Sequence, residues 1–238
     1  MLREPPLQPA SYAKTGTWDT PRKVTRPYGW ESGALKTEKG YQRGRGRGTQ
    51  GSGEVRIIAG TLRGHRIPVA PRPGLRPTPG RSRETLFNWL RADLEGARIL
   101  DAFAGSGALG LEALSRGAAE VTFIEKDRRA AQTLQETLQR LGGPQTHLKE
   151  RDALAVLREA QLGPFDLVFL DPPFASSLAQ AALEILCAGP LLAPGAKIYL
   201  ELPQKAEPSL PEGLHRLRET RAGDSQAILL TWARPDHL

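Results

Sequence analysis

The residues best suited to chemistry form a short motif, Asp171-Pro-Pro-Phe174, directly after the apolar run 165–170. Two prolines restrict the backbone, so the Asp171 carboxylate and the Pro172 carbonyl would be held rigidly. The exocyclic amine of a nucleic-acid base is a poor nucleophile, because its lone pair is delocalised into the ring. Oxygens that accept its two N–H groups would aim that lone pair, and Phe174 would stack on the base. The motif predicts alkyl transfer to a base amine; the simpler alternative is a turn that caps the next helix.

A second motif, Gly105-Ser-Gly107-Ala-Leu-Gly110, has the pattern G-x-G-x-x-G between an expected strand and an expected helix. Glycines let the backbone turn tightly and approach a ligand, and the first helical turn offers free N–H groups. Glu125 ends the following strand, 20 positions after Gly105, where a carboxylate can accept both ribose hydroxyls of a nucleotide-like cofactor. By this pattern alone, a nicotinamide dinucleotide fits as well as the nucleoside of a methyl donor.

Asp101, four residues before the first glycine, favours the methyl donor. Dinucleotide sites keep this region apolar because a pyrophosphate is negatively charged, whereas a carboxylate suits a cation. S-adenosylmethionine carries a sulfonium and an ammonium group and no phosphate, and Asp101 would contact its methionine end through hydrogen bonds. Asp152 follows a third expected strand. It would either accept from the exocyclic amine of the adenine or cap the helix expected at 153–160, and both alternatives stay open.

Motifs of this kind belong at strand ends of a parallel sheet, and the chain alternates between strand-like and helix-like segments as such a sheet requires. Strands are expected at 98–103, 120–125, 146–150, 165–170 and 197–202, separated by helices at 107–116, 127–141, 153–160 and 176–187. Two further β-like runs, 214–220 and 226–232, have no long helix between them. The pattern predicts an α/β, Rossmann-like domain over 97–238, with a mostly parallel seven-stranded sheet, helices on both faces and one antiparallel strand.

Residues 54–96 are expected to form a smaller N-terminal unit. The β-rich runs 55–60 and 66–69 predict a β-hairpin with Arg63 and Arg66 at its tip. A proline-rich loop follows, and the segment 82–90 predicts a helix whose apolar side chains face a core.

Residues 1–53 are rich in Gly, Pro and basic residues, with few aliphatic side chains and an alternating run, Arg43-Gly-Arg-Gly-Arg-Gly48. Such a segment cannot bury enough apolar surface to offset its ordering entropy, so a disordered basic tail is expected. Basic residues interleaved with aromatics are typical of tails that bind single-stranded nucleic acid; a tail without a role is the alternative. A third alternative is that translation begins at Val55.

Charge and composition narrow the class of protein. The formal net charge is +6 for residues 1–53, +5 for 54–98 and −4 for 99–238, which favours a front that faces a polyanion. The single cysteine and four scattered histidines give neither a disulfide framework nor metal-ligand spacing. No uncharged apolar run reaches about 18 residues, and the N-terminus lacks an apolar signal core. We expect a soluble, cytoplasmic monomer with no metal and no membrane partner.

Together these motifs make the chain resemble the bacterial 16S ribosomal RNA (guanine-966-N2)-methyltransferase family over about residues 55–234. The marks of the resemblance are Arg56-Ile-Ile-Ala-Gly60, Arg63-Gly64, Gly74-Leu-Arg-Pro-Thr78, Arg83-Glu-Thr-Leu-Phe-Asn-Trp-Leu90, the run from Leu100 to Gly117, and Phe165 to Phe174. Pro79 and Gly80 depart from the family, which usually has a small hydroxyl residue and an aspartate there. Thr137 stands where the family often has an asparagine. Neither change touches the Asp171 motif.

The resemblance implies a class I methyltransferase fold, S-adenosylmethionine as the donor, and one guanine of 16S rRNA methylated at its exocyclic N2 in the assembled or assembling 30S subunit. By position in the family's motifs, the methionine end of the donor would be lined by Asp101, Phe103, Gly105, Ser106 and Gly107. Glu125 would hold its ribose and Asp152 its adenine. The guanine would be handled by Asp171, Pro172 and Phe174. RNA phosphates would be contacted by Arg63, Arg66, Arg76, Arg81 and Arg83.

Three other functions remain open. An adenine-N6 DNA methyltransferase, or another nucleic-acid amino-methyltransferase, uses the same Asp-Pro-Pro-aromatic logic. It would normally add a target-recognition domain, for which the 185 residues from 54 onward leave no room. A nicotinamide-dependent dehydrogenase leaves the Asp171 motif and the basic front unexplained. A non-catalytic RNA-binding assembly factor would need no Asp171.

Overall fold

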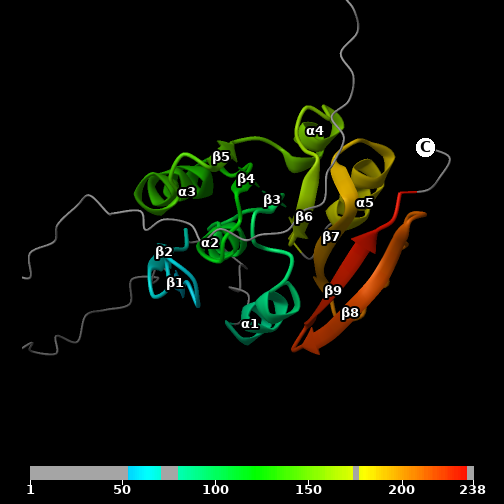
Figure 1. The fold of residues 1–238 in the computed structure, drawn as a ribbon, viewed down its shortest axis with the longest axis horizontal. Coiled ribbons are helices and arrows are strands. Elements are labelled where there is room, and N and C mark those ends of the chain that lie inside the picture. The colour runs from blue at the N-terminus through cyan, green and yellow to red at the C-terminus, as the bar shows by residue number, and fades with distance from the viewer. Residues whose placement is uncertain (1–52, 71–79, 174–176, 235–238) are drawn as a thin grey trace, which may run out of the picture. The chain divides into compact units, whose positions relative to one another are not determined.

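The computed structural model describes residues 53–70, 80–173 and 177–234, without the side chains of 80–82. The described residues belong to one compact unit, built on a seven-stranded sheet with strand order β5-β4-β3-β6-β7-β9-β8 (Figure 1). Its strands are β3 (Arg98–Asp101), β4 (Glu120–Ile124), β5 (Thr146–Lys149), β6 (Phe165–Leu170), β7 (Leu192–Pro203), β8 (Leu214–Ala222) and β9 (Ser225–Trp232). A separate two-stranded sheet consists of β1 (Glu54–Arg56) and β2 (Arg66–Pro68).

The large sheet is parallel from β5 through β7, and only β9, between β7 and β8, runs in the opposite direction. This confirms the predicted mostly parallel sheet with one antiparallel strand. The chain moves outward from β3 to β4 and β5, and then returns to add β6 on the other side of β3. Open α/β sheets bind ligands outside the carboxyl ends of the strands at such a switch point, so the fold directs attention to the ends of β3 and β6.

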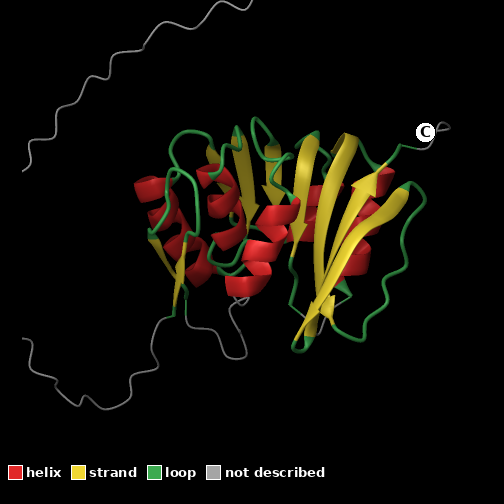
Figure 2. Cartoon of the chain, turned by 60° about the horizontal axis from the view of Figure 1, so that its bottom comes forward, coloured by secondary structure: helices red, strands yellow, loops and turns green. Residues whose placement is uncertain are grey.

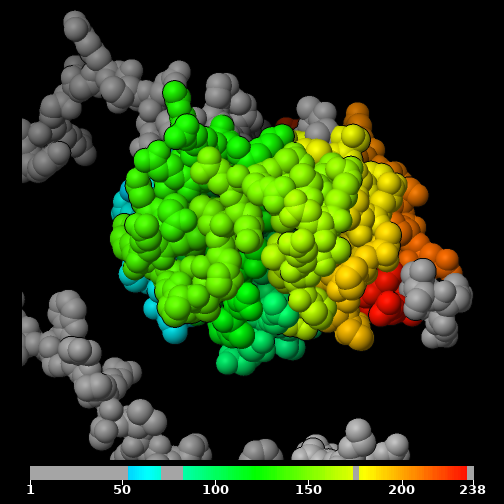
Figure 3. Space-filling view, turned by 90° about the horizontal axis from the view of Figure 1, so that it is seen from above, coloured from blue at the N-terminus to red at the C-terminus, as the bar shows by residue number. Residues whose placement is uncertain are grey.

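Helices cover both faces of the sheet, as predicted. They are α1 (Gly80–Trp89), α2 (Ala108–Ser115), α3 (Arg128–Leu141), α4 (Ala153–Arg158) and α5 (Leu178–Ala188). One core cluster joins the hairpin and α1, α2 and α3 to the sheet, and the other joins α4 and α5 to the opposite face. Figure 1 shows α1 and α2 on one side of the sheet and α4 and α5 on the other. Figure 3 shows in space-filling form the face on which α4 and α5 lie, with β8 in orange and β9 in red beside them.

Strand β6 shows why residues 167–170 form a continuous apolar run before Asp171. Val168 and Leu170 belong to one core cluster and Leu167 and Phe169 to the other, and all four are fully buried. A parallel strand with helices over both faces must be apolar on both sides. The run 165–170 therefore forms a central strand, whose end is held by packing from two directions.

Several boundaries differ from the sequence prediction by one or two residues, and two further differences have an evident physical reason. Strand β7 begins at Leu192 rather than at 197, because Leu192 pairs with Phe165 before a register shift, after which Lys197 pairs with Leu167. A bulge of this kind tolerates irregular residues inside a strand. Arg66 lies within β2, opposite Arg56, rather than at the hairpin tip. The hairpin lies beside α2 and α3, apart from the seven-stranded sheet (Figure 2).

Cys187 is buried, and burial raises the pKa of its thiol to about 12, so it packs as an apolar side chain. Within residues 53–70, 80–173 and 177–234, no group of three or more His, Cys, Asp or Glu side chains is arranged to hold a metal ion. In these same ranges, no helix has the length and apolar character needed to cross a membrane.

Candidate functional site

Three neighbouring strands end at one edge of the sheet, and an acid lies at or just beyond the end of each. Phe123 of β4 and Phe169 of β6 flank Asp101 of β3 in one row across the sheet. Glu125 and Asp171 each follow two residues beyond that row. The register therefore brings the predicted donor residues and the predicted base residue to the same edge.

The glycine motif turns the chain from β3 into α2. Gly105 has φ 54°, and a Cβ atom added to it would meet nothing within 4 Å. A Cβ atom added to Gly110 would lie 2.2 Å from Cε1 of Phe123. Gly110 is therefore needed for the packing of α2 on β4, whereas Gly105 leaves its backbone open to a ligand. Phe103 and Ser106 are half-buried in the same loop.

Glu125 holds the glycine loop against the end of β4. Its Oε2 accepts a hydrogen bond of 2.8 Å from the N–H of Gly105, and its Oε1 accepts one of 2.7 Å from the N–H of Asp127. The side chain of Asp127 in turn accepts from Ala130 N and caps α3. A single carboxylate thus fixes both the loop expected at the methionine end of the donor and the start of the next helix. Its contact with a ribose stays a prediction.

Asp101 is the most deeply buried of the three acids at this edge, with 2 % of its surface exposed, compared with 5 % for Glu125 and a half-buried Asp171. Its Oδ2 accepts from the N–H of Gly110 at 3.1 Å, so it braces the first turn of α2. Burial raises the pKa of this carboxyl to about 7; the Glu125 charge adds to the rise and the Gly110 hydrogen bond opposes it. A carboxyl with this pKa responds strongly to a cation placed beside it.

Binding of S-adenosylmethionine is therefore expected to release protons near neutral pH. A cationic donor stabilises the ionised form of Asp101 and lowers its pKa from about 7. Binding below pH 7 therefore releases protons, and donor affinity weakens as the pH falls below about 7. Titration calorimetry at about pH 6.5, in buffers of different ionisation enthalpy, measures the release. Asp101→Asn should remove it. A binding heat in the wild-type protein that is independent of the buffer would contradict the expected contact.

Asp152 precedes α4, and its Oδ1 accepts from the N–H of Ala155 at 3.1 Å. The structure thus has the N-cap contact that was one of the two alternatives for this residue. The side chain is exposed, and a role at the adenine stays a prediction.

Asp171 follows β6 and is half-buried, whereas Pro172 is buried and Pro173 is exposed. The end of β6 and the two prolines place this residue at the switch point, and its contact with a base amine stays a prediction. Phe174, the predicted stacking residue, lies outside the described residues.

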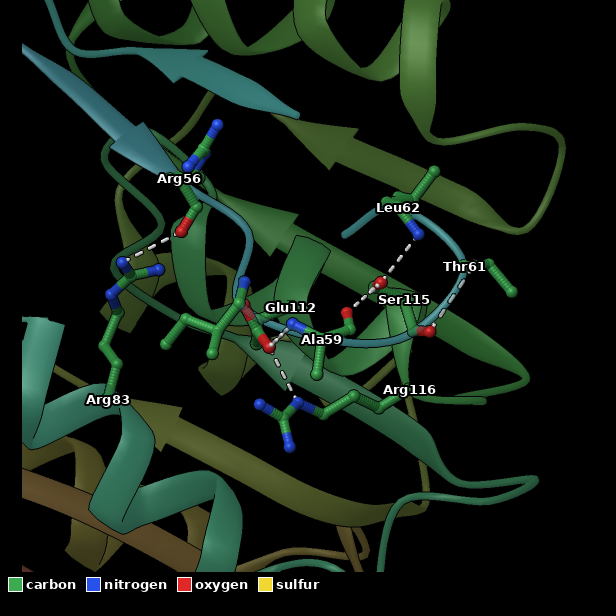
Figure 4. A network of polar contacts seen from close by, with 9 residues as sticks. Arg56, Ala59, Thr61, Leu62, Arg83, Glu112, Ser115 and Arg116 are labelled. Atoms are coloured by element: carbon green, nitrogen blue, oxygen red, sulfur yellow. Dashed lines mark hydrogen bonds and ion pairs between the residues drawn. The ribbon is translucent and has the colours of Figure 1, made fainter. Parts of the chain in front are cut away.

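Sequence reasoning missed the residue that anchors the hairpin. Glu112 of α2 is 0 % exposed, and its carboxylate accepts from the N–H groups of Ile58 at 2.7 Å and Ala59 at 3.1 Å. Arg116, one turn later, donates to the same carboxylate at 2.7 Å (Figure 4). A buried carboxylate needs this number of donors to be stable. The hairpin is therefore fixed to the helix that begins at the glycine motif.

Ser115 adds a second anchor at the end of α2. Its Oγ accepts from Leu62 N at 2.8 Å and donates to the carbonyl of Ala59, and its own carbonyl accepts from Thr61 N at 2.7 Å (Figure 4). Gly60 has φ 82°, and a Cβ atom added there would lie 1.7 Å from the Ser115 carbonyl oxygen. Only glycine permits this approach.

The surface position expected for Arg83 is wrong. Its side chain is 6 % exposed, and its Nη2 donates to the carbonyl of Arg56 at 3.1 Å, whereas Nε and Nη1 are buried without a partner. Burial lowers the pKa of the guanidinium, and the nearby Glu112 charge opposes this. The segment 83–90 presents one side to the core, and Arg83 lies on that side between α1 and the hairpin (Figure 4). It therefore packs inside rather than facing a phosphate.

Arg63 and Arg66 remain exposed on the hairpin, as predicted. Arg66 forms an ion pair of 2.8 Å with Glu54, between two exposed side chains. Arg63 lines a hollow of about 580 Å³, together with Arg56, residues 57, 58 and 64, and the start of α1. Arg76 lies outside the described residues, and Arg81 lies in α1 without a described side chain.

Comparison with known proteins agrees with this arrangement. Residues 55–231 match the family model described as "Conserved hypothetical protein 95". The ribosomal RNA small subunit methyltransferase D of Haemophilus influenzae is 46 % identical over 174 residues, which are 72 % of this chain and 90 % of that protein. The Escherichia coli protein of the same name is 46 % identical over 175 residues, covering 73 % of this chain and 87 % of that protein.

Solved structures show the same fold. A protein of Escherichia coli superposes with a TM-score of 0.70 at 40 % identity, covering 77 % of this chain and 100 % of that one. A protein of Haemophilus influenzae gives 0.67 at 41 % identity, covering 76 % and 99 %. The family match over residues 55–231 includes the hairpin and nearly all of the seven-stranded sheet.

Proposed function

The chain belongs to the Conserved hypothetical protein 95 family and is related to ribosomal RNA small subunit methyltransferases D, and from this premise we propose that it methylates 16S rRNA with S-adenosylmethionine. The target is the exocyclic N2 of one guanine in the assembled or assembling 30S subunit, and the protein acts in the cytoplasm. The observation that carries the proposal is the Asp171 carboxylate, held by two prolines at the end of β6, beside the glycine loop that follows β3.

The residues present fit the methyl donor. Gly105 leaves open space where a backbone must approach a ligand, and Glu125 lies at the strand end where a ribose is held. Burial raises the pKa of Asp101. A bound cation would stabilise its ionised carboxylate, whereas the negative charge of a pyrophosphate would destabilise it. When bound, the donor supplies an electrophilic methyl group on a sulfonium. The loop residues hold that methyl toward the switch point.

Asp171 acts on the nucleophile. Its carboxylate would accept an N–H of the guanine amine, and the Pro172 carbonyl would accept the second, so the lone pair would leave conjugation and become available to attack the methyl carbon. Phe174 stacks on the guanine ring. Holding nucleophile and methyl in near-attack geometry can supply about 7–11 kcal/mol of the barrier. No strong base is needed, because the nitrogen loses its proton readily once it is alkylated.

Transfer of tritium from labelled S-adenosylmethionine tests the reaction. Equal amounts of 30S particles lacking the modification, free 16S rRNA and duplex DNA are incubated with the protein, and incorporated label is counted. We expect label in the particle and none in DNA. Label in DNA would support the amino-methyltransferase of DNA, and no label in any substrate, with donor binding intact, would support a non-catalytic RNA-binding factor.

The hairpin is proposed to contact RNA phosphates through Arg63, which is exposed at its tip. Replacing Arg63 by glutamine should reduce the slope of log affinity against log salt concentration by about 0.7–0.9, the value for one lost phosphate contact. Binding of the particle is measured at several salt concentrations. The matched control is Arg158→Gln, an exposed arginine on α4 at the other face of the sheet, which should leave the slope unchanged. An equal slope for Arg63→Gln and the wild type would exclude Arg63 from the interface.

A further inference from the structure

Strand β7 brings a second acid to the edge where Asp171 lies. Leu170, the last residue of β6, pairs with Leu200 of β7, so the next residues, Asp171 just beyond β6 and Glu201 still within β7, follow side by side. Side chains alternate along a strand, which places both acids on the face that carries Phe169 and Tyr199. Glu201 is 4 % exposed, and neither donor binding nor base positioning accounts for it.

Tyr199 holds Glu201 in place. The Tyr199 hydroxyl donates to Oε2 of Glu201 at 3.0 Å, and the tyrosine is itself 1 % exposed. Its ring meets the ring of Phe169 edge-on, with centroids 6.2 Å apart, and Phe169 meets Phe87 of α1 in the same way at 6.0 Å. Three interlocked rings leave the hydroxyl no freedom to turn away, so the hydrogen bond to Glu201 is built into the core.

The groups around Glu201 form one electrostatic unit with Asp171. Burial raises the pKa of Glu201, whereas the hydroxyls of Tyr199 and Ser225 lower it. Burial, Glu201 and Asp171 together raise the pKa of Tyr199. Across the sheet, β9 presents uncharged Ala227 beside Glu201, and α1 reaches this face through the Phe87 ring. The Asp171 charge acts on Tyr199, whose hydroxyl donates to Glu201, so Tyr199 links the two acids.

We propose that Glu201, held by Tyr199, is a positioning residue for methyl transfer that acts through Asp171. Glu201 receives from Asp171 the proton that the methylated amine gives up. This inference rests on the proposed function. The lone pair of the amine nitrogen forms a bond to the methyl carbon, and the carbon–sulfur bond breaks with its electron pair going to sulfur, which becomes a thioether. The excess proton on nitrogen passes to the Asp171 carboxylate and from there to Glu201. Asp171 is then ionised again, and Glu201 loses the proton to solvent.

Two variants that preserve shape separate this role from packing. In Glu201→Gln the proton acceptor is lost together with its negative charge. A carboxylate ionises more readily without a negative neighbour, so the acid limb of the activity profile should move to lower pH. In Tyr199→Phe the ring packing remains but the hydrogen bond that favours ionised Glu201 is lost, so the acid limb should move to higher pH. The two shifts have opposite signs, which loss of packing alone does not produce.

The experiment measures kcat and KM of the full chain, with 30S particles and S-adenosylmethionine, from about pH 5.5 to 9. Glu201→Gln should lower kcat about tenfold or more, with both KM values within about twofold of wild type. Tyr199→Phe should shift the acid limb upward by about one pH unit, the equivalent of one hydrogen bond to a charged group. Glu184→Gln, an exposed acid on α5, is the matched control and should match the wild type throughout.

The role of Glu201 would be overturned if the acid limb were unshifted in both variants. It would also be overturned if both limbs moved in the same direction, in proportion to the loss in melting temperature. Either result would leave the proposed function intact. A wild-type chain that transfers no methyl group to the particle would instead overturn the proposed function, and this role with it.

Discussion

Replacing Asp171 by alanine is expected to lower kcat about 100- to 1,000-fold, the loss typical when one preorganised hydrogen-bonding group is removed from an active site. Donor affinity should stay within about twofold of wild type, because the proposed donor residues belong to β3, β4 and the glycine loop, whereas Asp171 follows β6 on the other side of β3. Single-turnover rates with 30S particles measure the first quantity, and titration calorimetry with S-adenosylmethionine measures the second.

The matched control is Asp166→Asn at the other end of the same strand, where the side chain is exposed and accepts from the N–H of Arg98 at 2.8 Å. This change should leave turnover within about twofold of wild type, since it is far from the carboxyl edge. An Asp171→Ala variant that turns over normally at saturating donor but binds the donor poorly would contradict the role assigned to this carboxylate.

Replacing Glu125 by glutamine is expected to weaken donor binding about 10- to 100-fold. Both oxygens of Glu125 accept backbone N–H groups, from Gly105 and Asp127, and an amide retains only one acceptor oxygen. One of the two backbone N–H groups would then face an NH₂ group. Loss of its hydrogen bond to a charged acceptor costs about 1.5–3 kcal/mol and loosens the glycine loop. The dissociation constant of S-adenosylmethionine, measured by calorimetry, reports the effect.

Glu136→Gln on the exposed face of α3 is the control for this substitution, and should leave donor affinity unchanged. At saturating donor, Glu125→Gln should recover most of its turnover, because the target site at β6 is intact. Unchanged donor affinity in Glu125→Gln would remove this residue from the donor site, and lost turnover at saturation would assign it to the chemical step.

The sheet and its switch point could be predicted because the relevant signals are local. Each strand–helix pair has its own periodicity, the run 165–170 is apolar on both faces, and the motifs at Gly105 and Asp171 carry their geometry within a few residues. Packing between neighbouring elements then follows from the right-handed crossover of parallel strands. Most boundaries differ by one or two residues; the larger differences are the earlier start of β7, where a bulge intervenes, and the earlier end of β1.

The contacts that the sequence did not reveal join residues far apart in the chain. Glu112 accepts from residues 53 and 54 positions earlier, so nothing near it in the sequence identifies its partners. Arg83 belongs to a basic segment, and charge alone predicted a surface position that the apolar side of its helix overruled. For Tyr199 and Glu201, a local signal existed, since residues two apart share one face of a strand. Their proximity to Asp171, however, depends on the register of β6 with β7.

Identification of the methylated nucleoside tests the central claim most directly. Particles lacking the modification are incubated with the protein and S-adenosylmethionine, their 16S rRNA is digested to nucleosides, and these are separated by liquid chromatography with mass spectrometry. The expected product is N2-methylguanosine, formed by the wild-type chain and reduced about 100-fold or more with Asp171→Ala. A product methylated on adenine, or an equal yield of N2-methylguanosine from Asp171→Ala, would contradict the assignment of guanine N2 to the Asp171 site.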